Sequence, residues 1–169
     1  MSTQVEIERK FIIEKPSVSD MSAMKEYTAS DITQIYLDSP KSVTHRIRSR
    51  RYPTHTAYTE TLKIRIDAMS ASERESEISA ERFSELSKNI AKDSRVLEKT
   101  RHTFLYGEHT VEIDNYPEWE STAVLEVELK SRDEQISLPD FIKIIKEVTG
   151  DKRYSNASMS RTFPEELVP

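Results

Sequence analysis

The chain contains no cysteine, and this absence excludes several kinds of chemistry at once. Disulfide bonds, a thiol nucleophile and a zinc site built from thiolates all require that residue. Glycine is almost as scarce, because only Gly107 and Gly150 occur among the 169 residues. Two isolated glycines cannot form the glycine-rich loop that holds phosphate with backbone N–H groups. Any phosphate group that binds here must therefore be held by side chains.

The chain also lacks a histidine cluster and a long apolar run. Its four histidines, His45, His55, His102 and His109, show no metal-ligand spacing and are interpreted as incidental. No hydrophobic stretch approaches the length of a membrane span, and residues 1–10 do not resemble a signal peptide. These absences predict a cytoplasmic protein with no membrane partner.

The net charge of −5 limits the possible partners further. It excludes a general nucleic-acid binder, and an anionic substrate would need local cations or a metal ion. Charged residues make up 33% of the chain and hydrophobic residues only 36%, which fits a fold with many charged interior positions. We expect a single domain over 1–169, in which 163–169 form a loose tail.

Charged and apolar residues alternate in four runs, at 5–11, 45–48, 62–66 and 125–130. Strand side chains repeat with a period of two, so each run places charges on one face and apolar residues on the other. One such run is typical of a half-buried strand with a solvated face. Here whole strands carry charges of one sign, which is destabilising unless an opposite charge or a bound ion neutralises them. Paired carboxylates bind divalent metals and paired cations bind phosphate, so the pattern predicts a site for a metal–polyphosphate complex.

The same periodicity predicts the fold. Strands are expected at 4–13, 28–37, 43–51, 56–66, 73–79, 94–106, 109–116 and 122–130, and helices at 17–26, 81–92 and 139–149. Consecutive antiparallel strands of this number tend to close into a barrel. The helices need an apolar surface to pack on, so the charged faces should line the interior. The expected class is α+β: a closed eight-stranded antiparallel β-barrel, or tunnel, with a charged lumen and helices packed outside.

The predicted lumen holds nearly equal numbers of acids and cations. The inward acids are Glu6, Glu8, Glu75, Glu77, Glu112, Asp114, Glu126 and Glu128. The inward cations are Lys10, Arg46, Arg48, Lys63, Arg65, Lys99 and Arg101. Unpaired charges in such an interior are unfavourable, so this near balance is what a wet, ion-lined tunnel requires.

Nine short motifs occur in the order found in one protein family. The first, at 5–11, resembles the Glu-x-Glu-x-Lys signature of the CYTH superfamily, the triphosphate tunnel metalloenzymes. The others are Gln34-Ile35-Tyr36-Leu37, Arg46-Ile47-Arg48, Thr61-Leu62-Lys63, Glu75-Ser76-Glu77, Glu98-Lys99-Thr100-Arg101, Glu112-Ile113-Asp114, Glu126-Val127-Glu128 and Asp151-Lys152-Arg153-Tyr154-Ser155-Asn156. They span 4–157 and most resemble the short bacterial members of the tripolyphosphatase type. In one departure, Glu73 stands where similar bacterial proteins often carry arginine, and Arg65 is the cation that could cover this loss.

The resemblance implies hydrolysis or cyclisation of a small-molecule triphosphate with Mg²⁺ or Mn²⁺ as cofactor. It assigns the metal to Glu6, Glu8, Asp114, Glu126 and Glu128, with Glu75, Glu77 and Glu112 as supporting acids of the lumen. It assigns phosphate to Arg46, Arg48, Lys63, Arg65, Lys99, Arg101 and Lys152. Lys10 and Tyr36 take the places of the pair that handles the nucleophilic water in similar enzymes.

The leading expectation is metal-dependent hydrolysis of inorganic tripolyphosphate to pyrophosphate and phosphate. The alternatives are a class IV adenylate cyclase, which makes cyclic AMP and pyrophosphate from ATP, a thiamine triphosphatase, and a polyphosphate- or nucleotide-binding module without turnover. The complete motif set argues against the binding module. Trp119 could stack on the aromatic rings of thiamine, but we interpret it as a packed loop residue after Pro117.

Overall fold

The computed structural model describes residues 2–168 of the chain. Its strands are β1 (Ser2–Glu14), β2 (Lys25–Leu37), β3 (Thr44–Arg51), β4 (Thr56–Arg65), β5 (Ser70–Glu77), β6 (Leu97–Tyr106), β7 (His109–Asn115), β8 (Thr122–Leu129) and β9 (Ile144–Glu147). Its helices are α1 (Val18–Ser22), α2 (Ala80–Ser87), the 3₁₀ helix η1 (Lys152–Tyr154) and α3 (Asn156–Met159). None of these helices is long and apolar enough to cross a membrane.

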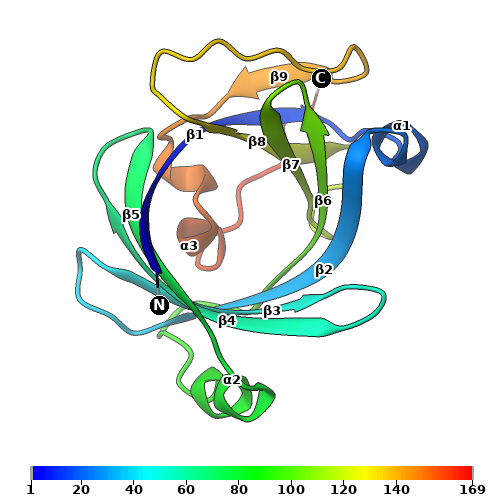
Figure 1. The fold of residues 1–169 in the computed structure, drawn as a ribbon. Helices are drawn as coiled ribbons and strands as arrows, with labels where there is room; N and C mark the ends of the chain where they lie inside the picture. The colour runs from blue at the N-terminus through cyan, green and yellow to red at the C-terminus, as the bar shows by residue number, and fades with distance from the viewer. Residues whose placement is uncertain (1, 169) are drawn as a thin grey trace.

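The strands β1–β8 form a closed ring, which Figure 1 shows from one end. Their order is β5-β4-β3-β2-β6-β7-β8-β1, and the ring closes because β1 also pairs with β5. Closure depends on the length of β1, which pairs with β5 through residues 2–7 and with β8 through residues 7–14. All of these pairings are antiparallel. The predicted α+β fold with a closed eight-stranded antiparallel barrel is confirmed.

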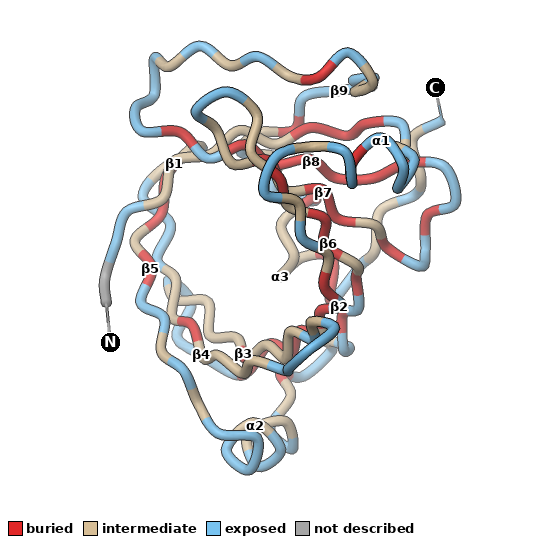
Figure 2. Tube along the Cα trace, turned by 45° about the vertical axis from the view of Figure 1, so that its right-hand side comes forward, coloured by how far each residue is buried: buried red, intermediate tan, exposed pale blue. Residues whose placement is uncertain are grey.

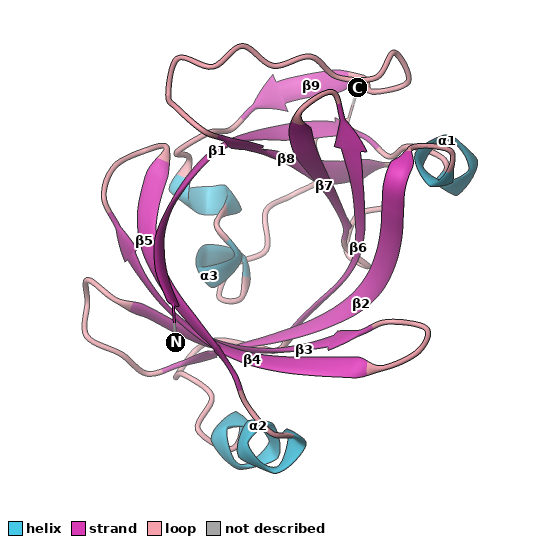
Figure 3. Cartoon of the chain, in the orientation of Figure 1, coloured by secondary structure: helices cyan, strands magenta, loops and turns pink. Residues whose placement is uncertain are grey.

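Much of the apolar core lies on the outside of the barrel. Ile35, Leu37 and Ile47, on β2 and β3, are buried against Phe83 and Leu86 of α2. Figure 3 shows α2 outside the ring. The side chain of Ser79 caps this helix by accepting a hydrogen bond from the backbone N–H of residue 82. Packing of α2 on the outer faces of β2 and β3 leaves the opposite faces of these strands to the lumen.

A larger cluster covers the outer faces of β1, β6, β7 and β8, where buried residues are concentrated in Figure 2. It includes Phe11, Phe104 and Leu125, and it is covered by Ile136 and Phe141 from the connection after β8. The apolar faces therefore point outward as expected. A loop covers them here, in place of the predicted helix.

The helix expected at 139–149 is wrong. Residues 139–142 form one turn, and Ile144–Glu147 form β9, which is antiparallel to β1. The reason lies in β1, which continues beyond β5 and leaves an edge whose backbone groups need partners. The isoleucines of β9 suit a strand, and this tertiary pairing overrides the helical spacing. The helices expected at 17–26 and 81–92 exist but are shorter, as α1 and α2.

The C-terminal segment closes one end of the barrel. Tyr154 and Met159 are buried in a second apolar cluster with Ile12 and Val124, which belong to β1 and β8. In Figure 1, α3 lies within the outline of the ring. The buried side chain of Met159 therefore anchors the start of the following segment at this end of the tunnel.

Of the loose tail expected at 163–169, residue 169 lies outside the described residues. The segment 163–168 contacts the barrel through Phe163 and Glu166. The rings of Phe163 and Trp119 meet edge to face with centroids 5.2 Å apart. The carboxylate of Glu166 accepts hydrogen bonds from the backbone N–H groups of Ser121 and Thr122, at 2.7 and 2.8 Å. Trp119 is 2% exposed and donates from Nε1 to the carbonyl oxygen of residue 164, so it packs as expected and is not free to stack on a substrate.

Gly150, between β9 and η1, is required by both conformation and space. Its φ is 75°, and a Cβ would lie 2.7 Å from the Cβ of Ala68. Gly150→Ala should lower the free energy of unfolding by about 2 kcal/mol and the melting temperature by about 4–8 °C. The control is Gly107→Ala in the β6–β7 turn, where φ is 60° but no atom lies within 4 Å, so the loss should be about 1 kcal/mol. Equal losses in thermal denaturation would contradict the role of Ala68.

Candidate active site

The lumen holds a cavity of about 880 Å³, and each of β1–β8 contributes a side chain to its wall. Fourteen of the seventeen predicted site residues line it: Glu6, Glu8, Lys10, Tyr36, Arg46, Arg48, Lys63, Arg65, Glu75, Arg101, Glu112, Glu126, Glu128 and Lys152. The period-two pattern therefore brings residues from eight separate strands to one internal surface. Ser155, Asn156 and Ser158 add a polar wall from the C-terminal segment.

Three predicted site residues do not line this cavity. Glu77 lies at the exposed end of β5. Lys99 and Asp114 are both buried and pair with each other, with Nζ of Lys99 2.8 Å from Oδ2 of Asp114. Asp114 also accepts from Nε of Arg101 at 2.7 Å. Burial by itself raises the pKa of Asp114, but the Arg101 and Lys99 charges hold it far below its usual range.

The carboxylates of the cavity repel one another. The nearby Glu126 carboxylate, together with burial, raises the pKa of Glu8 to about 7. Burial, together with the Glu112 and Glu126 charges, raises the pKa of Glu128. Burial and the neighbouring Glu73 carboxylate raise the pKa of Glu6 to about 8. A cation placed among these oxygens would relieve the repulsion that contributes to all three shifts.

These carboxylates fit a divalent metal that binds together with a substrate. Among residues 2–168, no three acidic or histidine side chains converge so as to hold a metal ion by themselves. Mg²⁺ characteristically binds through one or two carboxylates and completes its shell with water and substrate phosphate. The adjacent acids Glu8 and Glu126 offer such a pair of hard oxygen donors. The donor set therefore suits a hard cation that arrives with phosphate.

The arginines on the opposite part of the wall are crowded and incompletely paired. Burial and the charges of Arg46 and Arg101 lower the pKa of Arg48 to about 9. Nε of Arg46 is buried and makes no hydrogen bond within the described part of the chain. A buried donor without an acceptor is unfavourable, and so is the crowding of like charges. Anionic oxygens bound in the cavity would accept a hydrogen bond from the unpaired donor and reduce the repulsion among the arginines.

Gln34 fixes two of the predicted site residues and was not itself predicted as one. It is fully buried, and its Oε1 accepts from Nε and Nη2 of Arg48 at 3.1 and 2.9 Å. Its Nε2 donates to the hydroxyl of Tyr36 at 2.6 Å. The Tyr36 oxygen is thus occupied as an acceptor, and its own proton remains available to a group in the cavity.

Lys10 is held as an ammonium ion. Its Nζ lies 3.3 Å from Oε1 of Glu126 and donates to the carbonyl oxygen of Tyr154 at 3.1 Å. Burial works to lower the pKa of Lys10, but the charges of Glu126 and Glu8 raise it overall. A protonated Lys10 can donate hydrogen bonds and stabilise negative charge, and it does not accept a proton in this state.

The sequence contained signals for the lining residues that the prediction missed. Arg50 lines the cavity and continues the alternation of Arg46 and Arg48 along β3, so the period of two was sufficient to find it. Asn156, which also lines the cavity, and Gln34, which holds Arg48 and Tyr36, both lie inside the matched motifs. Asn156 accepts from the hydroxyl of Tyr116 at 2.6 Å, a contact between distant segments that no local pattern indicates.

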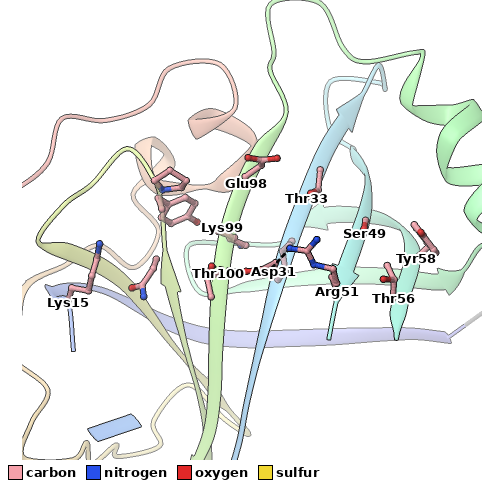
Figure 4. Close-up of a pocket in the computed structure, with 14 residues that line it drawn as sticks. Lys15, Asp31, Thr33, Ser49, Arg51, Thr56, Tyr58, Glu98, Lys99 and Thr100 are labelled. Atoms are coloured by element: carbon pink, nitrogen blue, oxygen red, sulfur yellow. Dashed lines mark hydrogen bonds and ion pairs between the residues drawn. The ribbon is translucent and has the colours of Figure 1, made fainter. Parts of the chain in front are cut away.

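A second hollow of about 720 Å³ lies on the exposed face of β2, β3 and β6, and Figure 4 shows its lining. Asp31 accepts hydrogen bonds there from Arg51 at 3.0 Å and from Thr100 at 2.9 Å. Asp31 and Arg51 are 54% and 71% exposed. Because water reaches the Asp31–Arg51 pair, its charges are screened, unlike the buried charges of the lumen.

Comparison with known proteins agrees with this geometry. The sequence model of the CYTH domain matches residues 4–163. The chain belongs to the CYTH family. The inorganic triphosphatase of Acetivibrio thermocellus is 30% identical over 155 residues, which cover 91% of this chain and 92% of that protein.

Solved structures show the same CYTH fold. The crystal structure of the inorganic triphosphatase NE1496 matches with a TM-score of 0.61 and 28% identity, over 95% of this chain and 97% of that one. The protein PH1012 from Pyrococcus horikoshii OT3 matches with a TM-score of 0.57 and 20% identity, over 76% and 80% of the two chains. At the lower identity the likeness shows the fold alone.

Proposed function

We propose that this CYTH protein is a metal-dependent triphosphatase that hydrolyses inorganic tripolyphosphate to pyrophosphate and phosphate. The observation that carries the proposal is a cavity in the lumen whose wall combines crowded arginines with mutually repelling carboxylates. Two relatives, 30% and 28% identical over nearly their whole length, are named inorganic triphosphatases.

The cations of the wall would bind the phosphate chain. Arg46, Arg48 and Arg101 present guanidinium groups, which match phosphate oxygens in charge and geometry. Lys63, Arg65 and Lys152 extend the positive surface. Phosphoryl transfer requires chiefly positioning and stabilisation of charge on the phosphate oxygens. The cations fixed on the tunnel wall would provide both.

The nucleophilic water would be oriented by Lys10 and Tyr36. In hydrolysis the water oxygen bonds to the terminal phosphorus, the bridging oxygen leaves with pyrophosphate, and the water proton passes to the phosphate oxygens of the products. Lys10 is an ammonium ion beside Glu126, and Tyr36 has its proton free to donate, so both act as hydrogen-bond donors. Glu6, Glu8, Glu126 and Glu128 would hold Mg²⁺ or Mn²⁺, which, when bound, withdraws charge from phosphate oxygens and lowers the pKa of bound water.

Substrate preference tests this function. We expect kcat/KM for tripolyphosphate to exceed that for ATP by at least about tenfold, because the binding energy would come from cations of the wall that contact phosphate oxygens. Phosphate release should be measured with tripolyphosphate, ATP and thiamine triphosphate, each with Mg²⁺ and with Mn²⁺. Cyclic AMP should be assayed in parallel. EDTA should abolish all turnover.

Efficient formation of cyclic AMP and pyrophosphate from ATP, with tripolyphosphate left uncleaved, would overturn the proposal in favour of a cyclase. A preference for thiamine triphosphate over tripolyphosphate would retain the reaction and change the substrate. Turnover that survives EDTA would contradict the metal requirement.

A further inference from the structure

Glu73 lies in the wall of the tunnel, in contact with two cations that the proposed function assigns to phosphate. Its side chain is 5% exposed, and its Oε1 lies 3.5 Å from Nη2 of Arg46. Its Oε2 lies 3.9 Å from Nζ of Lys63 and accepts no hydrogen bond within residues 2–168. Lys63 also lies 3.7 Å from Oε2 of Glu6, so its ammonium stands between two carboxylates. A buried acid thus stands beside the carboxylate of Glu6 and in contact with two cations that would otherwise be available to anions.

Glu73 has opposite consequences for a free triphosphate and for its metal complex. A free phosphate oxygen that approaches Arg46 or Lys63 must compete with Glu73 for these cations. It also comes to rest near a negative charge in a site of low dielectric, which is unfavourable. A divalent cation bound to the same phosphates reverses the second effect, because the free oxygen of Glu73 attracts it.

We propose that Glu73 makes the tunnel select the divalent-metal complex of a triphosphate over the metal-free anion. The inference rests on the proposed function for the class of substrate, and it adds the residue that sets the ionic form of that substrate. Arg46 and Lys63 remain the proposed phosphate ligands. Glu73 competes with phosphate for these two cations, and a divalent metal bound to the phosphate offsets the unfavourable effect of the Glu73 charge.

Calorimetric binding of a triphosphate analogue tests this selection without turnover. The probe is diimidotriphosphate, in which NH replaces the two bridging oxygens, titrated in EDTA and separately in saturating Mg²⁺. In EDTA, Glu73→Gln should bind the probe at least about tenfold more tightly than the wild type, because one like charge is removed from the site. In Mg²⁺ the gain should disappear or reverse. A gain of the same factor in both media, or no gain in EDTA, would overturn the inference.

Two further variants make the result specific. Glu60→Gln removes a carboxylate from β4 that pairs with His45 and Arg82 and lies outside the tunnel, so its affinities should equal those of the wild type in both media. If Glu73→Gln fails to fold, as judged by circular dichroism, Glu73→Ala removes the same charge and serves in its place. A similar gain for Glu60→Gln would show that overall charge alone is responsible, and would contradict a role for Glu73.

The outcome separates this inference from the proposed function. Preference of the wild type for the metal complex, lost in Glu73→Gln, would support the inference even if tripolyphosphate were not cleaved. Cleavage of tripolyphosphate with equal metal dependence of binding in both proteins would retain the function and overturn the inference. If the wild type did not bind the probe even in Mg²⁺, both would be rejected.

Discussion

Asp114→Ala should lower the free energy of unfolding by about 3–5 kcal/mol, the largest stability loss we expect from a single substitution of a charged residue near the tunnel. Asp114 is 1% exposed. It accepts from Nε of Arg101 at 2.7 Å and lies 2.8 Å from Nζ of Lys99. Both cations are buried, and without the carboxylate Lys99 loses its ion pair and Arg101 retains only Glu112, so the cost of their desolvation and their mutual repulsion are no longer fully offset.

Urea denaturation, followed by circular dichroism, measures this loss as a lower midpoint at unchanged slope. Asp31→Ala is a matched control, because Asp31 also accepts from an arginine and from a second side chain, at 3.0 and 2.9 Å. Its pair with Arg51 is exposed, so its removal should cost less than about 1 kcal/mol. Comparable losses in the two variants would contradict the importance of burial. Asp114→Asn, which keeps the shape and one acceptor oxygen, should fall between them.

This prediction also bears on how Asp114 contributes to activity. The family resemblance assigns it to the metal, whereas the structure places it in a buried pair of contacts with Lys99 and Arg101. Arg101 lines the cavity and donates to Glu112 at 2.9 Å as well. We therefore expect Asp114 to position Arg101 for phosphate, and loss of activity in Asp114→Ala must be compared with its loss of stability.

The charged interior could be predicted because it depends on a local rule. In a strand, alternate side chains share a face, so Glu6 with Glu8, and Arg46 with Arg48, could be assigned to one surface without knowing the partners. The pairings of β1–β8 then bring these faces together. The position of each residue along the tunnel axis does not follow from this local rule, since it depends on strand tilt and register. For that reason the sequence could not show that Lys99 lies against Asp114, away from the cavity.

The C-terminal part of the chain shows where local pattern fails. The apolar spacing after Pro139 is helical, and only the free edge of β1 makes Ile144–Glu147 a strand. In the same way, Glu73 could be recognised as a departure from similar proteins, but its contacts with Arg46 and Lys63 depend on β3, β4 and β5 meeting in the barrel. In both cases the observed structure depends on partners that are distant in sequence.

Glu126→Gln should reduce metal-dependent kcat/KM for tripolyphosphate by at least about 1,000-fold. Glu126 stands beside Glu8, whose pKa it raises, together with burial, to about 7, so these two acids form a candidate pair of ligands for a divalent cation. A neutral amide removes one of two hard anionic donors and weakens the site. The expected loss combines weaker metal binding with less stabilisation of charge on the transferred phosphate.

The same substitution tests how Glu126 contributes to the fold. Relief of repulsion with Glu8 by itself predicts equal or higher stability in the variant. The structure adds Lys10, whose Nζ lies 3.3 Å from Glu126 in a largely buried pair. Burial raises the pKa of Glu126, but Lys10 and Arg101 lower it to about 2, so the charged form is the stable one. Glu126→Gln should therefore lose about 1–3 kcal/mol in the absence of metal.

Phosphate release over a range of Mg²⁺ concentrations, together with urea denaturation in EDTA, separates the two effects. Glu126→Asp keeps the charge on a shorter side chain, so it should regain part of its activity as Mg²⁺ is raised, whereas Glu126→Gln should not. Glu60→Gln, which removes a carboxylate outside the tunnel, should keep full activity. Unchanged turnover of Glu126→Gln at ordinary Mg²⁺ concentrations would exclude Glu126 from the metal site. It would leave Glu126 the structural role of holding Lys10 as an ammonium ion beside the phosphate-binding wall.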